Sequence, residues 1–370
     1  MITRLAGIGD LQEAGEIIRR GGLVAFPTET VYGLGGNALD PEAAKKIYAA
    51  KGRPSDNPLI VHVSSIEEVG PLVRSFPAAA KHLMEAFWPG PLTIILPKSE
   101  IVPEETTGGL DTVAVRCPEN RLTLRFIREA GVPIAGPSAN VSGKPSPTEA
   151  QHVMDDLGGR IDMVLDDGPV GVGVESTIID MSGPVPMLLR PGAVTVEELS
   201  EALGQQVEID PAILAGTVAE GVRPKAPGMK YRHYAPNARM TLVTTALLRE
   251  RDFAVSPAEQ AAEDERIADY INAEAGISVK AGNRVGILCC EETKSLYRTA
   301  YGTIKVDIRV LGSRKDPLSM THELFRKLRD FDDDRVDEIF SESYSDRGVG
   351  FALMNRLRKA AGMQETILED

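Results

Sequence analysis

Cysteine is scarce in this chain of 370 residues, which contains three. Cys117 stands alone, and Cys289 and Cys290 are adjacent, so the sequence offers neither a disulfide framework nor the ligand spacing of a zinc site. Residues 1–9 contain no apolar core of signal-peptide length, and no apolar run approaches the roughly 18 residues that cross a membrane. We therefore expect a protein of the reducing cytoplasm that does not bind membranes.

Positive charge is in the minority, with 41 Lys and Arg against 54 Asp and Glu and a formal net charge of −13. This balance argues against a broad nucleic-acid-binding surface, because clustered cations bind the phosphate backbone, but it is compatible with a local basic site. Hydrophobic residues make up 42% and charged residues 26% of the chain, as is ordinary for a globular protein. The length favours two domains.

Familiar nucleotide and metal motifs are missing from the sequence. Gly143-Lys144 is followed by Pro145, so it does not form a Gly-x-x-x-x-Gly-Lys-Ser/Thr loop. His322-Glu323 lacks the second histidine of a metalloprotease helix, and Gly348-Val-Gly350 lacks the third glycine of a dinucleotide site. An ATP site in this chain would therefore be of another kind.

The segment Lys51-Gly-Arg-Pro-Ser-Asp-Asn-Pro58 places two cations one residue apart in a turn that contains two prolines. Lysine supplies a mobile charge and arginine a planar set of donors, so the pair can bind several phosphate oxygens. Pro54 and Pro58 restrict the residues before them to extended geometry, and Asn57 adds an uncharged donor. The segment is a candidate anion-binding turn, although a solvated basic turn at a helix end fits the same residues.

Other polar residues stand at the ends of expected strands. A strand at 59–63 contains His62, which fits either a core position or a ligand contact, and a strand at 111–116 ends in Arg116. The loop at 133–148 interleaves Ser138, Asn140 and Ser146 with glycine and proline, a composition that also suits an ordinary turn-rich loop. Strand ends in α/β folds face ligand sites, so these residues are candidates for binding.

Helix and strand patterns alternate along the chain. The first part predicts helices at 11–18, 41–51 and 77–87, with a proline-started helix after Asp40 and capping boxes at Ser65/Glu68 and Thr195/Glu198. The last part predicts strands at 240–244, 284–289, 304–311 and 336–340 between helices around 264–275, 316–330 and 348–362. Such alternation predicts a small, parallel, doubly wound domain.

Five motifs follow one another over residues 10–205: Pro27-Thr-Glu-Thr-Val-Tyr-Gly-Leu, Lys51-Gly-Arg-Pro, Ser138-Ala-Asn140, Glu175-Ser-Thr177 and Arg190-Pro-Gly192. Together they resemble the YrdC-type threonylcarbamoyl-AMP synthases. The family implies an α/β fold with a twisted open sheet and a basic cavity, and a reaction in which L-threonine, bicarbonate and ATP give threonylcarbamoyl-AMP and pyrophosphate for the modification of adenosine in tRNA. The Pro-rich stretch up to Asn237 resembles the lid-like linker of the two-domain form.

The resemblance implies three domain segments and a set of site residues. The segments are a catalytic domain at 1–210, a linker at 211–238 and a Rossmann-like domain at 239–370. Lys51 and Arg53 are implied as catalytic, and Tyr231 and Tyr234 as parts of the linker that cover the nucleotide. The expected ATP contacts are Arg53, Asn57, Thr112, Ser138, Ser146, Arg190 and Tyr234, and those to threonine or bicarbonate are Thr30, His62, Arg116, Gly136 and Ser176.

The same resemblance implies the ligands and partners of the chain. We expect Mg²⁺ to accompany ATP and to be held chiefly by its phosphates, and we assign no metal-binding residue and no general base. We expect the product to pass to a tRNA threonylcarbamoyltransferase complex, without stable binding of tRNA by this chain. Two alternatives use the same residues: an RNA-binding or ribosome-associated module, and a carbamoyltransferase of the hydrogenase-maturation type, whose cysteine pairs this sequence lacks.

Overall fold

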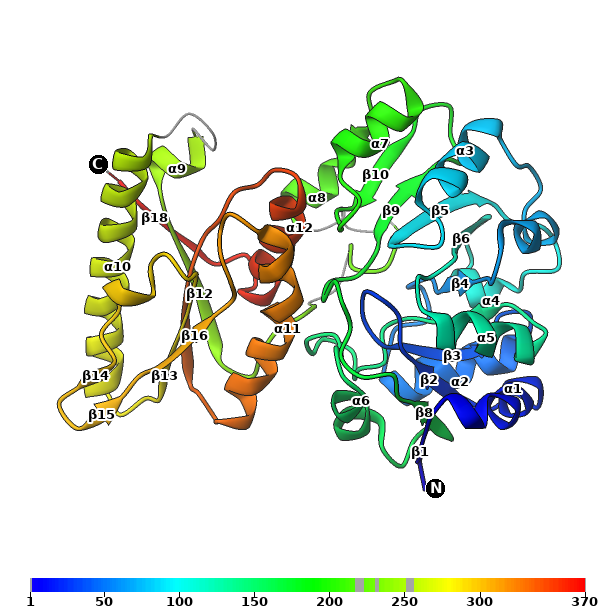
Figure 1. Ribbon diagram of the computed structural model, residues 1–370, viewed down its shortest axis with the longest axis horizontal. Coiled ribbons are helices and arrows are strands. Elements are labelled where there is room, and N and C mark those ends of the chain that lie inside the picture. Colours follow the sequence, from blue (N-terminus) through cyan, green and yellow to red (C-terminus); the bar gives the residue numbers. More distant parts are fainter. Residues whose placement is uncertain (1, 217–222, 230–232, 251–255, 370) are drawn as a thin grey trace. The chain divides into compact units, whose positions relative to one another are not determined.

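The structure is a computed structural model that describes residues 2–216, 223–229, 233–250 and 256–369. The chain divides into two compact units (Figure 1). One unit comprises Met1–Ser142 and Ser146–Tyr231, and the other comprises Gly143–Pro145 and Arg232–Asp370. Among the described residues, no helix combines the length and apolar character that a membrane span requires.

The first unit is built on a mixed β-sheet that has 11 strands within the described residues. Some neighbouring strands of this sheet are parallel and others are antiparallel. Several neighbours in the sheet, such as β1 and β8, are far apart in the sequence. In spatial order the strands are β1 (Arg4–Ala6), β8 (Met163–Leu165), β2 (Val24–Phe26), β3 (Gly33–Asn37), β7 (Ile134–Ala135), β4 (Ile60–His62), β6 (Thr112–Arg116), β5 (Leu92–Pro97), β9 (Thr177–Asp180), β10 (Met187–Arg190) and β11 (Glu208–Ile209).

Helices cover this sheet through apolar faces. The helices of the first unit are α1 (Leu11–Arg19), α2 (Pro41–Lys51), α3 (Ala78–Phe87), α4 (Glu104–Thr107), α5 (Arg121–Ala130), α6 (Ala150–Leu157), α7 (Val196–Leu203) and α8 (Pro211–Ala215), with 3₁₀ turns at Ile8–Asp10 and Ile66–Leu72. Side chains of α1 and α5 form one core with β2, and the two helices lie side by side (Figure 1). Gly15 lets them approach closely, because a Cβ there would stand 2.7 Å from the carbonyl oxygen of Glu129.

Helix α2 begins and ends where the sequence predicts. The side chain of Asp40 accepts a hydrogen bond from the main-chain N–H of Glu42, and Pro41 occupies the first helical position. Gly52 ends the helix in the left-handed conformation, with φ 62°, which glycine adopts at little cost. The helix therefore places Lys51 in its last turn, directly before the predicted anion-binding turn.

One predicted cap is confirmed and another is wrong. Thr195 and Glu198 form the expected capping box at the start of α7. The prediction of a capping box at Ser65 and Glu68 is wrong, because the Glu68 carboxylate accepts from the main-chain N–H and the hydroxyl of Ser64 instead. The segment after it is a 3₁₀ turn whose N-cap, Ser65, makes no side-chain hydrogen bond, so the donor to Glu68 is one residue earlier than expected.

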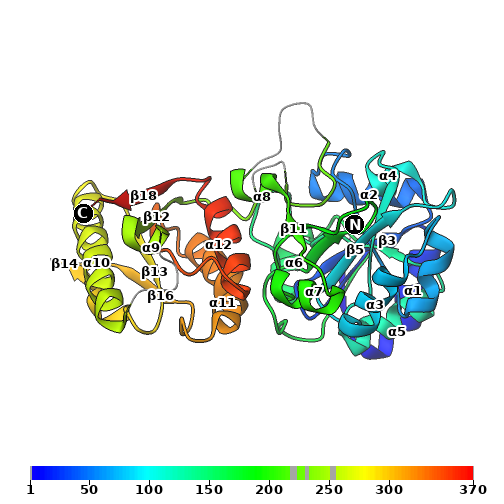
Figure 2. The ribbon, with the colours of Figure 1, turned by 90° about the horizontal axis from the view of Figure 1, so that it is seen from above.

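The second unit contains a five-stranded sheet in which all paired strands are parallel. Its strands are, in spatial order, β16 (Asp307–Val310), β13 (Val285–Cys289), β17 (Glu338–Glu342), β12 (Arg239–Thr245) and β18 (Glu365–Leu368). The helices are α9 (Ala246–Glu250), α10 (Pro257–Lys280), α11 (Pro317–Asp333) and α12 (Val349–Ala360), with a 3₁₀ turn at Lys294–Leu296. Helix α10 covers one face of the sheet and α11 and α12 cover the other (Figure 2), which confirms the predicted parallel, doubly wound arrangement.

Three details of this unit differ from the sequence prediction. The strand expected at 304–311 is divided, because Ile304–Lys305 (β15) pairs with Ala300–Tyr301 (β14) in a separate hairpin and only Asp307–Val310 joins the main sheet. Strand β17 begins two residues later than expected, and β18 has no predicted counterpart. Pairing partners far along the chain decide the boundaries of β17 and β18, and local pattern does not contain that information.

Candidate active site

The register of two parallel strands separates the candidate residues into two groups. His62 in β4 is paired with Arg116 in β6, so the two side chains share the carboxyl ends of adjacent strands. Thr112 begins β6, four residues before Arg116, which corresponds to about 13 Å along a strand. Arg53 and Asn57 precede β4 and therefore lie toward the same strand ends as Thr112. The expected ATP contacts Arg53, Asn57 and Thr112 are thus at one end of these strands, and His62 and Arg116 are at the other.

Arg116 is the centre of the second group. Its Nη2 donates to the hydroxyl of Thr30 over 2.9 Å and forms an ion pair with the Glu29 carboxylate at 2.8 Å. The side chains of Arg116 and Glu29 are only 4% and 10% exposed. The sequence predicted Arg116 and Thr30 as site residues but not Glu29. Glu29 lies between Thr28 and Thr30 and is the one acidic residue of that loop, a signal that could have identified it. A buried ion pair fixes the position of the guanidinium.

His62 is buried and neutral. Its ring packs edge-on against Phe26, with centroids 5.3 Å apart, and its Nδ1 is buried with no hydrogen-bond partner. Burial first and the nearby Arg116 guanidinium second lower the pKa of His62 to about 3. Gly136 lies against both rings, because a Cβ there would stand 2.7 Å from Phe26 and 3.1 Å from His62. The imidazole therefore offers a neutral acceptor or donor beside Arg116.

Lys51 connects the predicted anion-binding turn to the loop at 133–148. Its side chain is 1% exposed, and its Nζ donates to the carbonyl oxygens of Ser138 and, over 2.6 Å, Asn140. The main-chain carbonyl of Lys51 accepts from the N–H of Ser142 over 2.9 Å. The structure thus gives Lys51 a role in positioning the loop that contains Ser138.

Arg53 folds back onto its own turn. Its Nε donates to the carbonyl of Asn57 over 3.2 Å and its Nη2 donates to the carbonyl of Pro58 over 3.0 Å. Arg53 and Asn57 are both buried, at 8% and 2% exposed, and Asn57 Oδ1 is buried without a hydrogen-bond partner. The solvated basic turn that the sequence left open is therefore excluded.

Arg190 and Ser176 form a third contact. Arg190 donates from Nε to the carbonyl of Ser176 over 3.0 Å and from Nη2 to its hydroxyl over 3.1 Å. The same hydroxyl lies 2.8 Å from that of Thr93 in β5, and Arg190 Nη1 donates to the carbonyl of Pro227 over 3.5 Å. Sequence reasoning missed Thr93, because its pairing with Ser176 follows from the register of β5 against β9.

Ser146 contacts a third residue that the prediction missed. Its hydroxyl donates to the Glu175 carboxylate over 2.5 Å, and both side chains are buried. Glu175 belongs to the motif Glu175-Ser-Thr177, but nothing in the local sequence distinguishes it from an ordinary acidic residue before a strand. The contact links the loop at 133–148 to the glycine-rich segment before β9.

Main-chain hydrogen bonds hold the three loops together. The loop containing Thr30 lies between the other two: Tyr32 N–H donates to the carbonyl of Pro147 over 2.9 Å, and Gly173 N–H donates to the carbonyl of Thr30 over 3.1 Å. Ala139 N–H also donates to the carbonyl of Tyr32 over 2.8 Å. The structure thus brings the loops with Thr30, Ser138 and Ser176 into one cluster in the first unit.

The structure describes one of the two linker tyrosines. Tyr231 lies outside the described residues. Tyr234 belongs to the second unit, where its ring stacks on Phe325 with centroids 5.1 Å apart and lies 5.8 Å from the guanidinium carbon of Arg356. Within the described part of the chain, no group of three or more His, Cys, Asp or Glu side chains is arranged to hold a metal ion.

The mixed sheet, the parallel sheet and the loop cluster of buried arginines, lysine and hydroxyls define a two-domain α/β protein of the YrdC-like type. Residues 16–192 match the family described as telomere recombination (Sua5, YciO and YrdC), and residues 194–362 match the C-terminal domain of threonylcarbamoyl-AMP synthase. The chain is 45% identical to the threonylcarbamoyl-AMP synthase of Bacillus subtilis over 95% of its own length and 93% of that protein. This chain belongs to the threonylcarbamoyl-AMP synthase family.

Solved and shorter relatives add to this comparison. A crystal structure of Pyrococcus abyssi Sua5 complexed with L-threonine is 41% identical, covers 100% of both chains and superposes with a TM-score of 0.86. A putative threonylcarbamoyl-AMP synthase of Mycobacterium tuberculosis is 39% identical over 199 residues. The matched region covers 54% of this chain and 89% of that protein. The predicted fold, a YrdC-like sheet followed by a Rossmann-like parallel domain, is thereby confirmed.

Proposed function

We propose that this chain is a nucleotidyltransferase that makes L-threonylcarbamoyl-AMP from L-threonine, bicarbonate and ATP. The ammonium group of threonine loses a proton to solvent, and the free amine then attacks the carbon of bicarbonate and gives a carbamate with loss of water. A carbamate oxygen then attacks the α-phosphorus of ATP, and the bond to the β-phosphate breaks to release pyrophosphate. The observation that carries the proposal is that four cations, Lys51, Arg53, Arg116 and Arg190, are buried in the first unit of a chain that belongs to this family.

The group around Arg116 suits threonine and bicarbonate. The Arg116 guanidinium would bind a carboxylate, because two planar sets of donors and acceptors match in geometry. Neutral His62, with Nδ1 unpartnered, offers an acceptor to the substrate amine but is too weak a base to hold a proton at pH 7. The hydroxyls of Thr30 and Ser176 and the main chain at Gly136 complete the proposed threonine and bicarbonate site.

The remaining cluster suits the nucleotide. We assign Arg53, Asn57, Thr112, Ser138, Ser146 and Arg190 to ATP, and Lys51 and Arg53 to charge stabilisation as negative charge moves to pyrophosphate. The hydrogen bonds that Lys51, Arg53 and Arg190 make to main-chain carbonyls hold these cations in fixed positions before substrate arrives. We propose that Mg²⁺ enters with ATP and is held by phosphates and water.

The assignment extends to the linker, the domains and the partners. We propose that the catalytic domain spans residues 1–210, that the linker at 211–238 brings Tyr231 and Tyr234 over the nucleotide, and that residues 239–370 form a separate domain. A mixed anhydride hydrolyses in water, so a covering linker would protect the product. We further propose a cytoplasmic protein that passes its product to a tRNA threonylcarbamoyltransferase complex without a stable tRNA contact of its own.

Pyrophosphate release by the purified chain tests the proposal. ATP at fixed magnesium should yield pyrophosphate only when both L-threonine and bicarbonate are present. L-serine should support release poorly, because one missing methyl group in a fitted site lowers kcat/KM by roughly 10- to 200-fold. L-valine, which lacks the hydroxyl, should be rejected more strongly because buried hydroxyl partners are then left unpaired.

The same assay separates the enzyme from the RNA-binding alternative. If ATP stays intact with all substrates present while RNA binds with a steep dependence on salt, the cluster binds phosphate backbone and the synthase assignment is wrong.

A further inference from the structure

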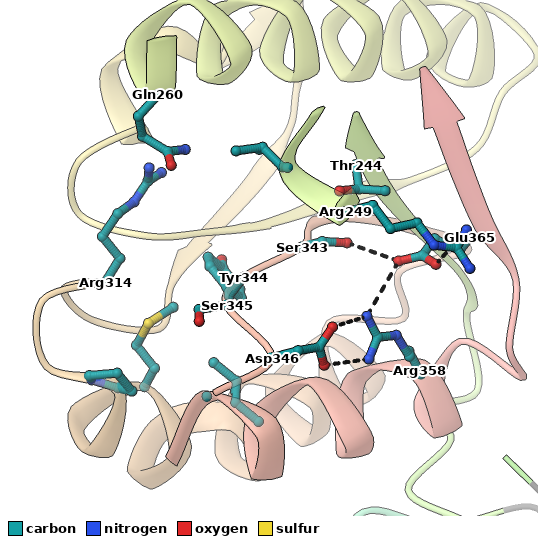
Figure 3. A pocket seen from close by; sticks show the side chains of 15 residues that line it. Thr244, Arg249, Gln260, Arg314, Ser343, Tyr344, Ser345, Asp346, Arg358 and Glu365 are labelled. Atoms are coloured by element: carbon teal, nitrogen blue, oxygen red, sulfur yellow. Dashed lines mark hydrogen bonds and ion pairs between the residues drawn. The ribbon is translucent and has the colours of Figure 1, made fainter. Parts of the chain in front are cut away.

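A second candidate site lies in the parallel sheet of the second unit. A cavity of about 180 Å³ opens beyond the carboxyl ends of β12 and β17 (Figure 3). Its wall includes Thr244 at the end of β12, the residues from Ser343 to Asp346 after β17, and Arg358 in α12. No residue of the loop cluster in the first unit contributes to it.

The position of this cavity in the sheet favours ligand binding. β12 and β17 are neighbours, yet the helices that follow them lie on opposite faces of the sheet, α9 and α10 after β12 and α12 after β17 (Figure 2). Such a switch point keeps the two following loops apart and leaves a crevice at the strand ends, where open α/β sheets bind their ligands. The cavity therefore occupies the expected ligand position of the fold.

The charges of the wall favour an anion. Three arginines line the cavity, Arg249, Arg314 and Arg358, against two carboxylates, Asp346 and Glu365. Arg249 pairs with Glu365 at 3.6 Å, so Arg314 is the arginine that no carboxylate of the wall balances. On one side of the cavity, Arg358 forms a bidentate ion pair with Asp346, in which both N–O distances are 2.5 Å. Arg314 lies on the opposite side (Figure 3).

Arg314 is paired only in part. Its Nη1 and Nη2 each donate to the Asp264 carboxylate over 3.0 Å, and Nη2 also lies 3.3 Å from Cys290 Sγ. Asp264 and Cys290 are not part of the wall, and Nε is buried and has no hydrogen-bond partner. The hydroxyl of Tyr344, another wall residue, is likewise buried without a partner. Buried polar atoms in native proteins nearly always have a partner, so two unpartnered ones on one wall point to a missing group.

The start of α12 adds main-chain donors to the same wall. Gly348 is the N-cap, and no side chain donates or accepts at this cap. Gly350 lies so close to the preceding loop that a Cβ there would stand 2.4 Å from the carbonyl oxygen of Ser345, which keeps the loop against the first helical turn. An uncapped helix N-terminus carries partial positive charge and free N–H groups, which bind phosphate well.

We propose that this cavity binds a small phosphate-bearing molecule, with its phosphate between the N-terminus of α12 and Arg314 and within reach of the Ser345 hydroxyl. The cavity is smaller than the roughly 300 Å³ at which sites for drug-sized ligands begin, so the ligand is no larger than a compact phosphomonoester. The absence of a third glycine after Gly350 agrees with this, because a dinucleotide would need closer approach of the main chain. The proposal does not depend on the reaction of the first unit.

Hydrogen–deuterium exchange of the full chain tests this phosphate-binding proposal, because it reports separately on the cavity of the second unit and on the first unit. Inorganic phosphate, AMP and acetate are titrated separately, and peptides covering 343–353 are compared with peptides of the first unit. Phosphate or AMP should slow exchange in 343–353 in a saturable manner, and acetate should not. No slowing, or equal slowing by acetate, overturns the phosphate assignment.

Two variants and a matched control complete the test. Arg314→Gln and Ser345→Glu should each raise the phosphate concentration for half-maximal protection about tenfold or more, by loss of a charged donor and by repulsion. Lys315→Gln removes the same charge from the next residue, which is exposed and outside the wall, and should leave that concentration unchanged. Ser345 is exposed, so its variant keeps the test valid if Arg314→Gln unfolds. Wild-type affinity in both variants overturns the proposal.

Discussion

At the scale of single residues, the cluster depends on charges that are buried together with their partners. Arg116 and Glu29 are both almost inaccessible and lie 2.8 Å apart. Removing one member of such a pair leaves the other as an unpaired buried charge, so loss of binding and loss of folding are easily confused. Replacing both members at once separates the two effects.

The first prediction concerns this ion pair. Arg116→Gln alone should lower the free energy of unfolding by about 3–5 kcal/mol, because Glu29 is left charged and buried. Arg116→Gln with Glu29→Gln should recover most of that stability yet lower kcat/KM for threonine about 10- to 100-fold, through loss of a charged hydrogen bond. Thermal unfolding and pyrophosphate release measure the two quantities. Arg128→Gln, at an exposed position in α5, is the control.

The second prediction concerns His62. Its pKa is about 3 in the folded chain and about 6.5 when unfolded. Between these values the unfolded chain binds one more proton, so His62 lowers stability as pH falls below 6.5, by about 1.4 kcal/mol per pH unit. From pH 6.5 to 5, wild type should lose about 2 kcal/mol more than His62→Gln.

Denaturant unfolding followed by tryptophan fluorescence measures this difference, because Trp88 is the only tryptophan and lies in the first unit. Every other titrating group is common to both proteins and cancels. Parallel stability curves for the two proteins over this pH range would show that His62 titrates normally.

At the scale of elements, helix α2 positions a loop as well as a turn. Lys51, in the last turn of α2, donates to the carbonyls of Ser138 and Asn140, which are nearly 90 residues away in the sequence. The loop therefore depends on the helix for its position. The lysine that resembled a phosphate ligand in the sequence also acts as a link between two binding segments.

The third prediction follows from this link. Lys51→Met keeps the length and apolar stem of the side chain but removes the donors. Exchange in peptides covering 138–148 should become faster, and pyrophosphate release should fall at least about 100-fold, since loss of charge and loss of position act together. Lys45→Met on the same helix, where the side chain is 55% exposed, should change neither. Normal exchange in 138–148 of the Lys51→Met variant would show that Lys51 has no positioning role.

The sequence predicted those features that short segments determine. The start of α2 at Asp40 and Pro41 and the capping box of α7 are local patterns of three or four residues, and both are confirmed. The partners Glu29, Thr93 and Glu175 were missed, because sheet register and loop contacts bring together residues far apart in the chain. The hairpin of β14 and β15 was missed for a different reason, because its two short strands adjoin β16 in the sequence and the pattern at 304–311 resembles one continuous strand.

At the scale of the whole molecule, the two units are not two continuous lengths of chain. Gly143–Pro145 belongs to the second unit, while the residues on both sides belong to the first. Within the second unit, Arg329 Nη2 donates to the carbonyl of Pro145 over 2.6 Å, and Ala235 N–H donates to that of Gly143 over 2.9 Å. The loop with Ser138 and Ser146 therefore has its tip among residues of the second unit.

The fourth prediction concerns a shortened chain. Residues 1–216 contain every strand of the mixed sheet and should fold, as the shorter Mycobacterium tuberculosis relative suggests. The segment 143–145 would lose its partners Ala235 and Arg329, so exchange there should be faster and pyrophosphate release about tenfold lower. Full activity with unchanged exchange would show that these contacts do not matter for the loop. Arg329→Gln in the full chain, which removes one of the contacts, should give a smaller change in the same direction.

The assignment of residues 143–145 to the second unit also sets the order of events during synthesis of the protein. The ribosome completes residues 143–145 long before Arg329 has been made, so the tip of that loop leaves the exit tunnel without its partners and waits for more than 180 further residues. A nascent chain released early would carry a finished mixed sheet but an unanchored loop. Completion of translation is thus the step that finishes a binding segment encoded in the first half of the gene.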